Sequence, residues 1–150
     1  MDRALLERAP KVLLHDHLDG GLRPETIAEL AELERYEGLP TTDPDELEQV
    51  MFQGGGRSLE DYLDAFRHTT GVLQTPEALH RAAREAAEDH AADGVVYAEV
   101  RFAPSLHQER GLAHDEIVEA VLAGLGEGAD ATGLTVRLLL DALRNQDDSR

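Results

Sequence analysis

Three apolar runs separated by long helical patterns constrain the fold of this sequence more than any other feature. They span residues 11–17, 95–102 and 135–143, and each has the length of a buried strand. Strands that alternate with helices predict a parallel α/β sheet with right-handed crossovers. A closed (β/α)₈ barrel takes about 250 residues. We therefore expect residues 1–150 to form the N-terminal part of a TIM-type barrel, with about three strands, truncated after the third.

The segments between the strands carry helix start signals and apolar residues at helical spacing. Leu59, Tyr62, Leu63 and Phe66 follow one another at i, i+3, i+4 and i+7, so they share one face of a helix that begins at Ser58. By spacing alone, such a face is more often core than a substrate lid. Helices are predicted to begin near Pro24, Asp43, Ser58, Thr75 and His114.

The charge balance narrows the classes of partner. Fourteen basic and 31 acidic residues give a formal net charge of −17, which repels nucleic acid and anionic lipid. No apolar run approaches the roughly 18 residues of a membrane helix. The chain has no cysteine, so disulfides and thiolate metal sites are excluded, and a cytoplasmic location is expected. A neutral or cationic small molecule fits this composition better than a polyanion.

The strongest chemical signal lies at the end of the first apolar run. His15 and His17 are separated by one residue, so on a strand both imidazoles point to the same face. Two such nitrogens can bind one metal ion, and zinc suits imidazole. Asp19 continues the same spacing, and Gly20 and Gly21 allow the backbone to turn close to a ligand.

The remaining polar residues are interpreted as structural. Glu99 and Arg101 share a face of the second strand and are expected to pair with each other. A solvated or capping role is expected for the other histidines, because none of them repeats a ligand spacing: His68, His80, His90, His107 and His114.

Three blocks together resemble the N-terminal half of an adenosine deaminase. They are H-D-H-L-D-G followed by P-E-T, then S-L-E-D-Y-L-D-A-F, then D-G-V-V-Y-A-E-V-R-F-A-P. Their order and spacing match the family from about Val12 to Arg144. The family is a zinc-dependent (β/α)₈ barrel of the metal-dependent hydrolases that converts adenosine and deoxyadenosine to inosine products and ammonia in purine salvage.

The resemblance implies roles for particular residues. His15 and His17 would be zinc ligands, His17 would also lie against the substrate, and Asp19 would bind the ribose 5′-hydroxyl. For the apolar helical face, the resemblance favours a gate over the pocket rather than a core role. This face comprises Leu59, Tyr62, Leu63 and Phe66. The family's other zinc ligands and its catalytic glutamate come from later strands. This segment would therefore contain no catalytic residue and would be inactive without the C-terminal half.

Two alternatives stay open at the level of the sequence. One is an adenine or AMP deaminase of the same superfamily, although Asp19 favours a nucleoside because adenine deaminases often carry glutamate there. The other is a non-catalytic fragment that binds a metal or a partner through its unpaired sheet edges. Asp16 stands where the family often has an apolar residue, and it is expected to point away from the metal.

Overall fold

Three parallel strands form one sheet in the computed structural model, which describes residue 5 and residues 8–52 and 59–144, without the side chains of residues 52 and 59–65. The strands are β1 (Lys11–His17), β2 (Val95–Phe102) and β3 (Thr135–Leu140). They lie in the order β1-β2-β3, and both neighbouring pairs are parallel. The predicted parallel α/β arrangement is therefore confirmed.

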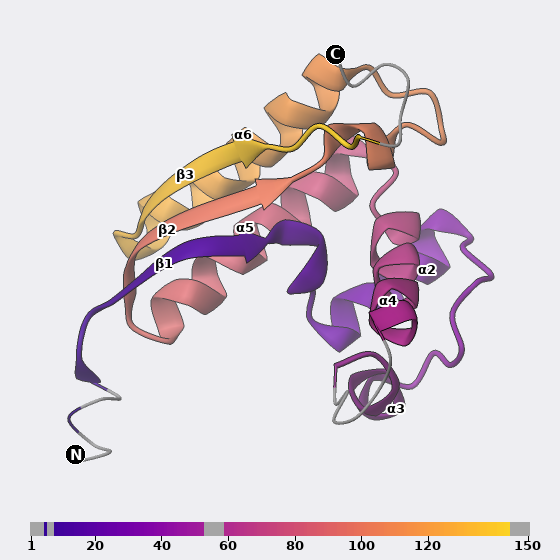
Figure 1. Ribbon diagram of the computed structural model, residues 1–150, viewed down its shortest axis with the longest axis horizontal. Coiled ribbons are helices and arrows are strands. Elements are labelled where there is room, and N and C mark those ends of the chain that lie inside the picture. Colours follow the sequence, from indigo (N-terminus) through magenta and orange to yellow (C-terminus); the bar gives the residue numbers. More distant parts are fainter. Residues whose placement is uncertain (1–4, 6–7, 53–58, 145–150) are drawn as a thin grey trace.

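The helices divide into a covering layer and an end group (Figure 1). The longest two, α5 (Pro76–Ala92) and α6 (His114–Thr132), lie against one face of the sheet. The others gather beyond the carboxyl end of β1. That end group comprises η1 (Leu18–Gly20), α2 (Pro24–Glu34), α3 (Pro44–Leu47), the π-helical turn η2 (Glu48–Phe52) and α4 (Leu59–Val72), while η3 (Pro104–His107) follows β2.

Local chemistry accounts for the helix boundaries. Asp43 caps α3 by accepting a hydrogen bond from the Glu46 backbone N–H at 3.1 Å. Thr75 caps α5 in the same way, accepting from the Ala78 N–H, and Pro76 occupies the first helical position. Gly133 ends α6 with a φ of 80°, a conformation that costs glycine little. The predicted helix starts at these positions are confirmed.

The core lies between the sheet and the two covering helices and continues into the end group of helices. It is built from small and branched side chains that are less than a tenth exposed, which lets helices and strands approach closely. Its central members are Ala98, Val100 and Phe102 on β2, Leu79, Ala83 and Ala87 on α5, and Ile117, Val121 and Leu125 on α6.

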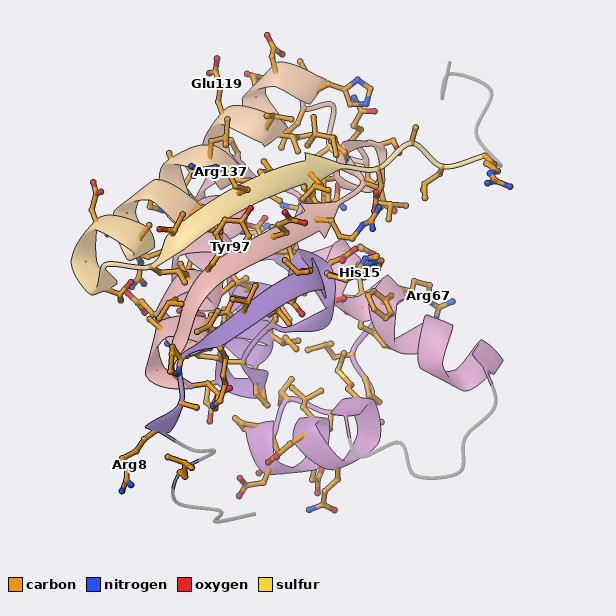
Figure 2. The ribbon with its side chains drawn as sticks, turned by 60° about the vertical axis from the view of Figure 1, so that its left-hand side comes forward. Arg8, His15, Arg67, Tyr97, Glu119 and Arg137 are labelled. Atoms are coloured by element: carbon orange, nitrogen blue, oxygen red, sulfur yellow. The ribbon has the colours of Figure 1, made fainter. Side chains whose placement is uncertain are left out.

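The opposite face of the sheet is uncovered in the described part of the chain. Figure 2 shows Tyr97 and Arg137 on this face, turned away from α6. Val12, which pairs with Tyr97, is 60% exposed, and Leu14 is 61% exposed. Apolar side chains on an open sheet face are typical of a surface that another layer covers.

The third strand is shorter than predicted. It ends at Leu140 rather than at residue 143. The last ladder-like bond runs from the Asp141 N–H to the Phe102 carbonyl at 2.9 Å, and β2 ends at Phe102 because Pro104 opens η3. Without a partner strand beside them, residues 142–144 do not continue the ladder.

Candidate functional site

The site begins with the two imidazoles at the carboxyl end of β1. The rings of His15 and His17 lie with their centroids 5.3 Å apart and their planes tilted by 51°. His15 is exposed and His17 is half-buried, so both are open to a ligand. The expectation that they share a face is confirmed. Figure 2 shows His15 near the end of β1 on the same side as α4.

Asp19 lies on η1 directly behind His17. The residue is only 4% exposed, and burial raises the pKa of its carboxyl, an effect that its own backbone N–H and His17 partly offset. Oδ1 of Asp19 is 4.0 Å from Nδ1 of His17, too far for a hydrogen bond, and among the described residues it has no hydrogen-bond partner. A buried acceptor without a partner is costly unless a ligand supplies a donor.

Phe66 joins this site from helix α4. Its ring stands edge-on to the His17 ring with centroids 6.3 Å apart. It also fills the space beside Gly20, where a Cβ would come within 3.1 Å of the Phe66 ring. Leu59, Tyr62 and Leu63 belong to the same helix, but their side chains are outside the described part, so their role in a gate stays a prediction.

An arginine–aspartate pair forms the other side of the site. Arg101 on β2 donates from Nε to Asp141 Oδ2 at 2.9 Å, and its Nη2 also bonds Asp141. Nη1 of Arg101 lies 3.2 Å from Nδ1 of His15. The guanidinium holds the pKa of the Asp141 carboxyl below its usual range, with smaller effects from His17 and His15.

The predicted pairing of Glu99 with Arg101 is wrong. Glu99 instead accepts a hydrogen bond from the Tyr97 hydroxyl at 3.0 Å. Arg101 instead pairs with Asp141, which directly follows β3, the strand beside β2. Asp141 was missed because residues 135–143 read as one strand, although it comes directly after the apolar run.

Two other histidines also depart from the solvated role expected of them. His107 is fully buried, and its Nδ1 donates to the Leu73 carbonyl at 2.9 Å. His90 lies on α5 with its Nε2 3.0 Å from Asp16 Oδ2, so Asp16 points to the helical layer and away from the His15 and His17 imidazoles, as predicted. Both contacts join segments far apart in sequence, which spacing does not reveal.

The donor set fits half of a zinc site. Two imidazoles on one face suit zinc, which takes three or more protein ligands in catalytic sites. Among the described residues, no group of three or more His, Cys, Asp or Glu side chains is placed to hold a metal ion. A complete site would therefore need ligands from outside this part of the chain.

Solved structures define the class of protein. An amidohydrolase from Burkholderia ambifaria with bound zinc matches 97% of this chain and 39% of its own, with a TM-score of 0.83 at 28% identity. Adenine deaminase from Arthrobacter aurescens matches 88% of this chain and 39% of its own, with a TM-score of 0.74 at 35% identity. The chain thus has the fold of the first part of a TIM-barrel amidohydrolase.

The particular family follows from the sequence comparison. The family model for adenosine deaminase matches residues 10–150, and the chain belongs to this family. The adenosine deaminase of Mycolicibacterium vanbaalenii is 55% identical over 152 aligned residues, which cover 97% of this chain. The chain spans 42% of the length of that relative. The resemblance drawn from the three sequence blocks is confirmed.

Proposed function

We propose that the whole protein is a zinc-dependent hydrolase that converts adenosine or deoxyadenosine to the inosine product and ammonia. This chain would supply two zinc ligands, His15 and His17, and a substrate contact, Asp19. The observation that carries the proposal is their common location, since the two imidazoles and the buried carboxylate meet at the carboxyl end of β1. Active sites of α/β barrels lie at this end.

The histidines would hold the metal and orient what lies beside it. Bound zinc supplies Lewis-acid chemistry, lowering the pKa of a water so that hydroxide is available near neutral pH. His17 would also lie against the substrate, because its ring contacts Phe66 and approaches Asp19. The donor that protonates the purine ring and the remaining ligands would come from later strands, as the family resemblance implies.

Asp19 favours a nucleoside over the related purines. Its buried Oδ1 needs a hydrogen-bond donor, and a ribose 5′-hydroxyl is such a donor. Adenine has no hydroxyl to offer. The phosphate of AMP would bring negative charge against a buried carboxylate that already titrates above its normal range. Adenosine and deoxyadenosine both keep the 5′-hydroxyl, so both would fit.

The face of α4 would close the pocket. Phe66 already packs on His17 and Gly20, and we propose that Leu59, Tyr62 and Leu63 extend this apolar cover. An apolar cover would exclude bulk water from the reacting atoms.

A role in purine salvage and a cytoplasmic location complete the proposal. No helix in the described ranges is long and apolar enough to span a bilayer.

A chimera tests this function directly. Residues 10–150 would replace the matching part of the Mycolicibacterium vanbaalenii adenosine deaminase, and loss of adenosine would be followed by ultraviolet absorbance. We expect turnover of adenosine and deoxyadenosine and stoichiometric zinc. His15→Ala or His17→Ala should remove zinc, measured by atomic emission, together with activity. Asp19→Ala should lower kcat/KM for adenosine about 10- to 100-fold, the worth of a hydrogen bond to a charged group.

Two outcomes would contradict the proposal. Normal zinc content in either histidine variant would refute the ligand assignment. Faster turnover of adenine or AMP than of adenosine would refute the role of Asp19. The unaltered Mycolicibacterium protein, assayed in parallel, controls for the remainder of the barrel.

A further inference from the structure

The ladder between β1 and β2 shifts its register twice, and the second shift cancels the first. β2 gains an extra residue, Val96, near the start. Farther along the ladder, the extra residue is on β1, because Leu14 and His15 of β1 together stand opposite Glu99 alone on β2. The paired residues are Lys11 with Val95, Val12 with Tyr97, Leu13 with Ala98, Asp16 with Val100, and His17 with Arg101.

The second shift decides where the two imidazoles point. If the register of Val12 and Leu13 continued unchanged, His15 would pair with Val100 and His17 with Phe102. Both of these β2 residues are buried beneath the helices, at 0% and 1% exposed. Because a slip of one residue turns side chains to the other face of a sheet, both histidines would leave the open face. The β-bulge at Leu14 and His15 therefore turns the side chains of both histidines to the open face of the sheet.

Side-chain and backbone contacts tie β1 to the end of α5 and the two residues after it, on both sides of the shifted stretch. At the start, Nζ of Lys11 contacts Asp93 Oδ1 at 2.8 Å, and the Lys11 N–H donates to the Gly94 carbonyl at 2.9 Å. After the second shift, Oδ2 of Asp16 lies 3.0 Å from Nε2 of His90, in the last turn of α5. Since α5 leads directly into β2, both contacts set β1 against the strand with which it pairs.

Asp16 is the first β1 residue in the restored register, and its partner Val100 faces the helices. Its side chain is 31% exposed and that of His90 is 18% exposed, so the pair is largely withdrawn from water. In the continued register Asp16 would instead stand opposite Arg101 on the open face, where it could pair with that guanidinium. The observed register instead brings Asp16 Oδ2 within 3.0 Å of His90 Nε2, a buried atom that makes no hydrogen bond among the described residues.

We propose that Asp16 and His90 are positioning residues that hold the second register shift and thereby turn His15 and His17 to the open face of the sheet. Their link to zinc rests on the proposed function, whereas their link to the register does not. The two parts can be tested separately in the 150-residue chain.

The register is measured by NMR without metal. Cross-strand NOEs between His17 and Arg101 report the observed register, and NOEs between His17 and Phe102 report the continued one. We expect His90→Leu to weaken the NOEs between His17 and Arg101 and to produce NOEs between His17 and Phe102. His80→Leu is the matched control, because His80 lies on the same helix and pairs with a carboxylate, Glu127, at 3.2 Å, but on α6 rather than β1. It should leave the His17 NOEs unchanged.

Zinc affinity is measured by competition with a chromophoric chelator. His90→Leu should raise the Kd for zinc about tenfold or more, as for other residues that orient metal ligands, while His80→Leu should leave it within about twofold. His90→Gln keeps a side-chain donor and should restore both the wild-type NOEs and the wild-type Kd.

Each outcome decides one of the two proposals. Unchanged NOEs in His90→Leu, or a His90→Gln variant that behaves like His90→Leu, would overturn the positioning role. If His15→Ala binds zinc as tightly as the wild type, the metal site fails instead, and the NOEs still decide whether Asp16 and His90 set the register.

Discussion

His107 is the most perturbed titratable side chain among the histidines of the described ranges. It is fully buried beside the ring of Phe102, and burial lowers its pKa from 6.5 to about 4 although the bond to Leu73 opposes this. Its Nδ1 carries the proton that bonds the Leu73 carbonyl, so the neutral form is the one that the fold accommodates. The side chain ties η3 to the end of α4.

This burial predicts a loss of stability in mild acid. The unfolded chain takes up a proton at His107 near pH 6.5, whereas the folded chain resists until about pH 4. The free energy of unfolding should therefore fall as the pH drops from 6.5 to 4, by about 3 kcal/mol from this residue. Urea unfolding followed by circular dichroism at several pH values measures the effect.

His107→Asn isolates the contribution of this group, because an asparagine amide can replace the Nδ1 donor but does not titrate. The variant should be less stable than the wild type at pH 7 and should lose less stability on acidification. An identical slope of stability against pH in both proteins would show that His107 does not titrate in this way.

At the level of elements, α5 and α6 are held at unusually close range by small residues. Gly124 lies so near α5 that a Cβ there would stand 2.2 Å from the His80 carbonyl oxygen. At Gly128 the corresponding distances are 2.7 Å to the Arg84 carbonyl oxygen and to the Cβ of Ala87. The opposing side is backbone and alanine, which cannot rotate out of the way. This contact fixes the layer that covers β2 and β3.

Added methyl groups in this contact should be destabilising. Gly124→Ala and Gly128→Ala should each lower the free energy of unfolding by about 2 kcal/mol, because the helices must separate to admit the new atom. Gly126 lies on the same helix, and no atom of the described residues lies within 4 Å of an added Cβ there. Gly126→Ala should be neutral or stabilising by up to about 1 kcal/mol, since alanine favours helix. Equal effects at all three positions would argue against close helix packing.

At the scale of the whole molecule, the sheet has one covered and one open face. The open face carries His15 and His17, the Arg101–Asp141 pair and exposed apolar side chains such as Val12. The chain spans 42% of the length of its Mycolicibacterium relative, and its described residues do not bring three metal-binding side chains together. Two histidines alone leave zinc without the third ligand that a catalytic site requires.

The 150 residues by themselves should therefore not deaminate adenosine. Purified chain, loaded with zinc and incubated with adenosine, should give no inosine by liquid chromatography, while the chimera described above should. Inosine formed by the isolated chain, and lost in His15→Ala, would contradict this expectation. A chain that binds zinc or a partner without turnover would agree with it.

The sequence by itself determined the order and type of the elements and the family. Apolar runs of strand length fixed β1 and β2 to the residue, and capping residues such as Asp43 and Thr75 marked helix starts, because these signals depend on neighbours along the chain. The spacing of His15 and His17 likewise placed two imidazoles on one face, since strand periodicity is local.

Only the tertiary structure decided which side chains meet across the fold. The pairing of Arg101 with Asp141, the burial of His107 and the contact of His90 with Asp16 join residues at least 34 positions apart. The register shifts in β1 depend on the neighbouring strand and helix as well as on β1 itself. Such contacts are selected by packing and burial, which act between segments that the chain brings together only when folded.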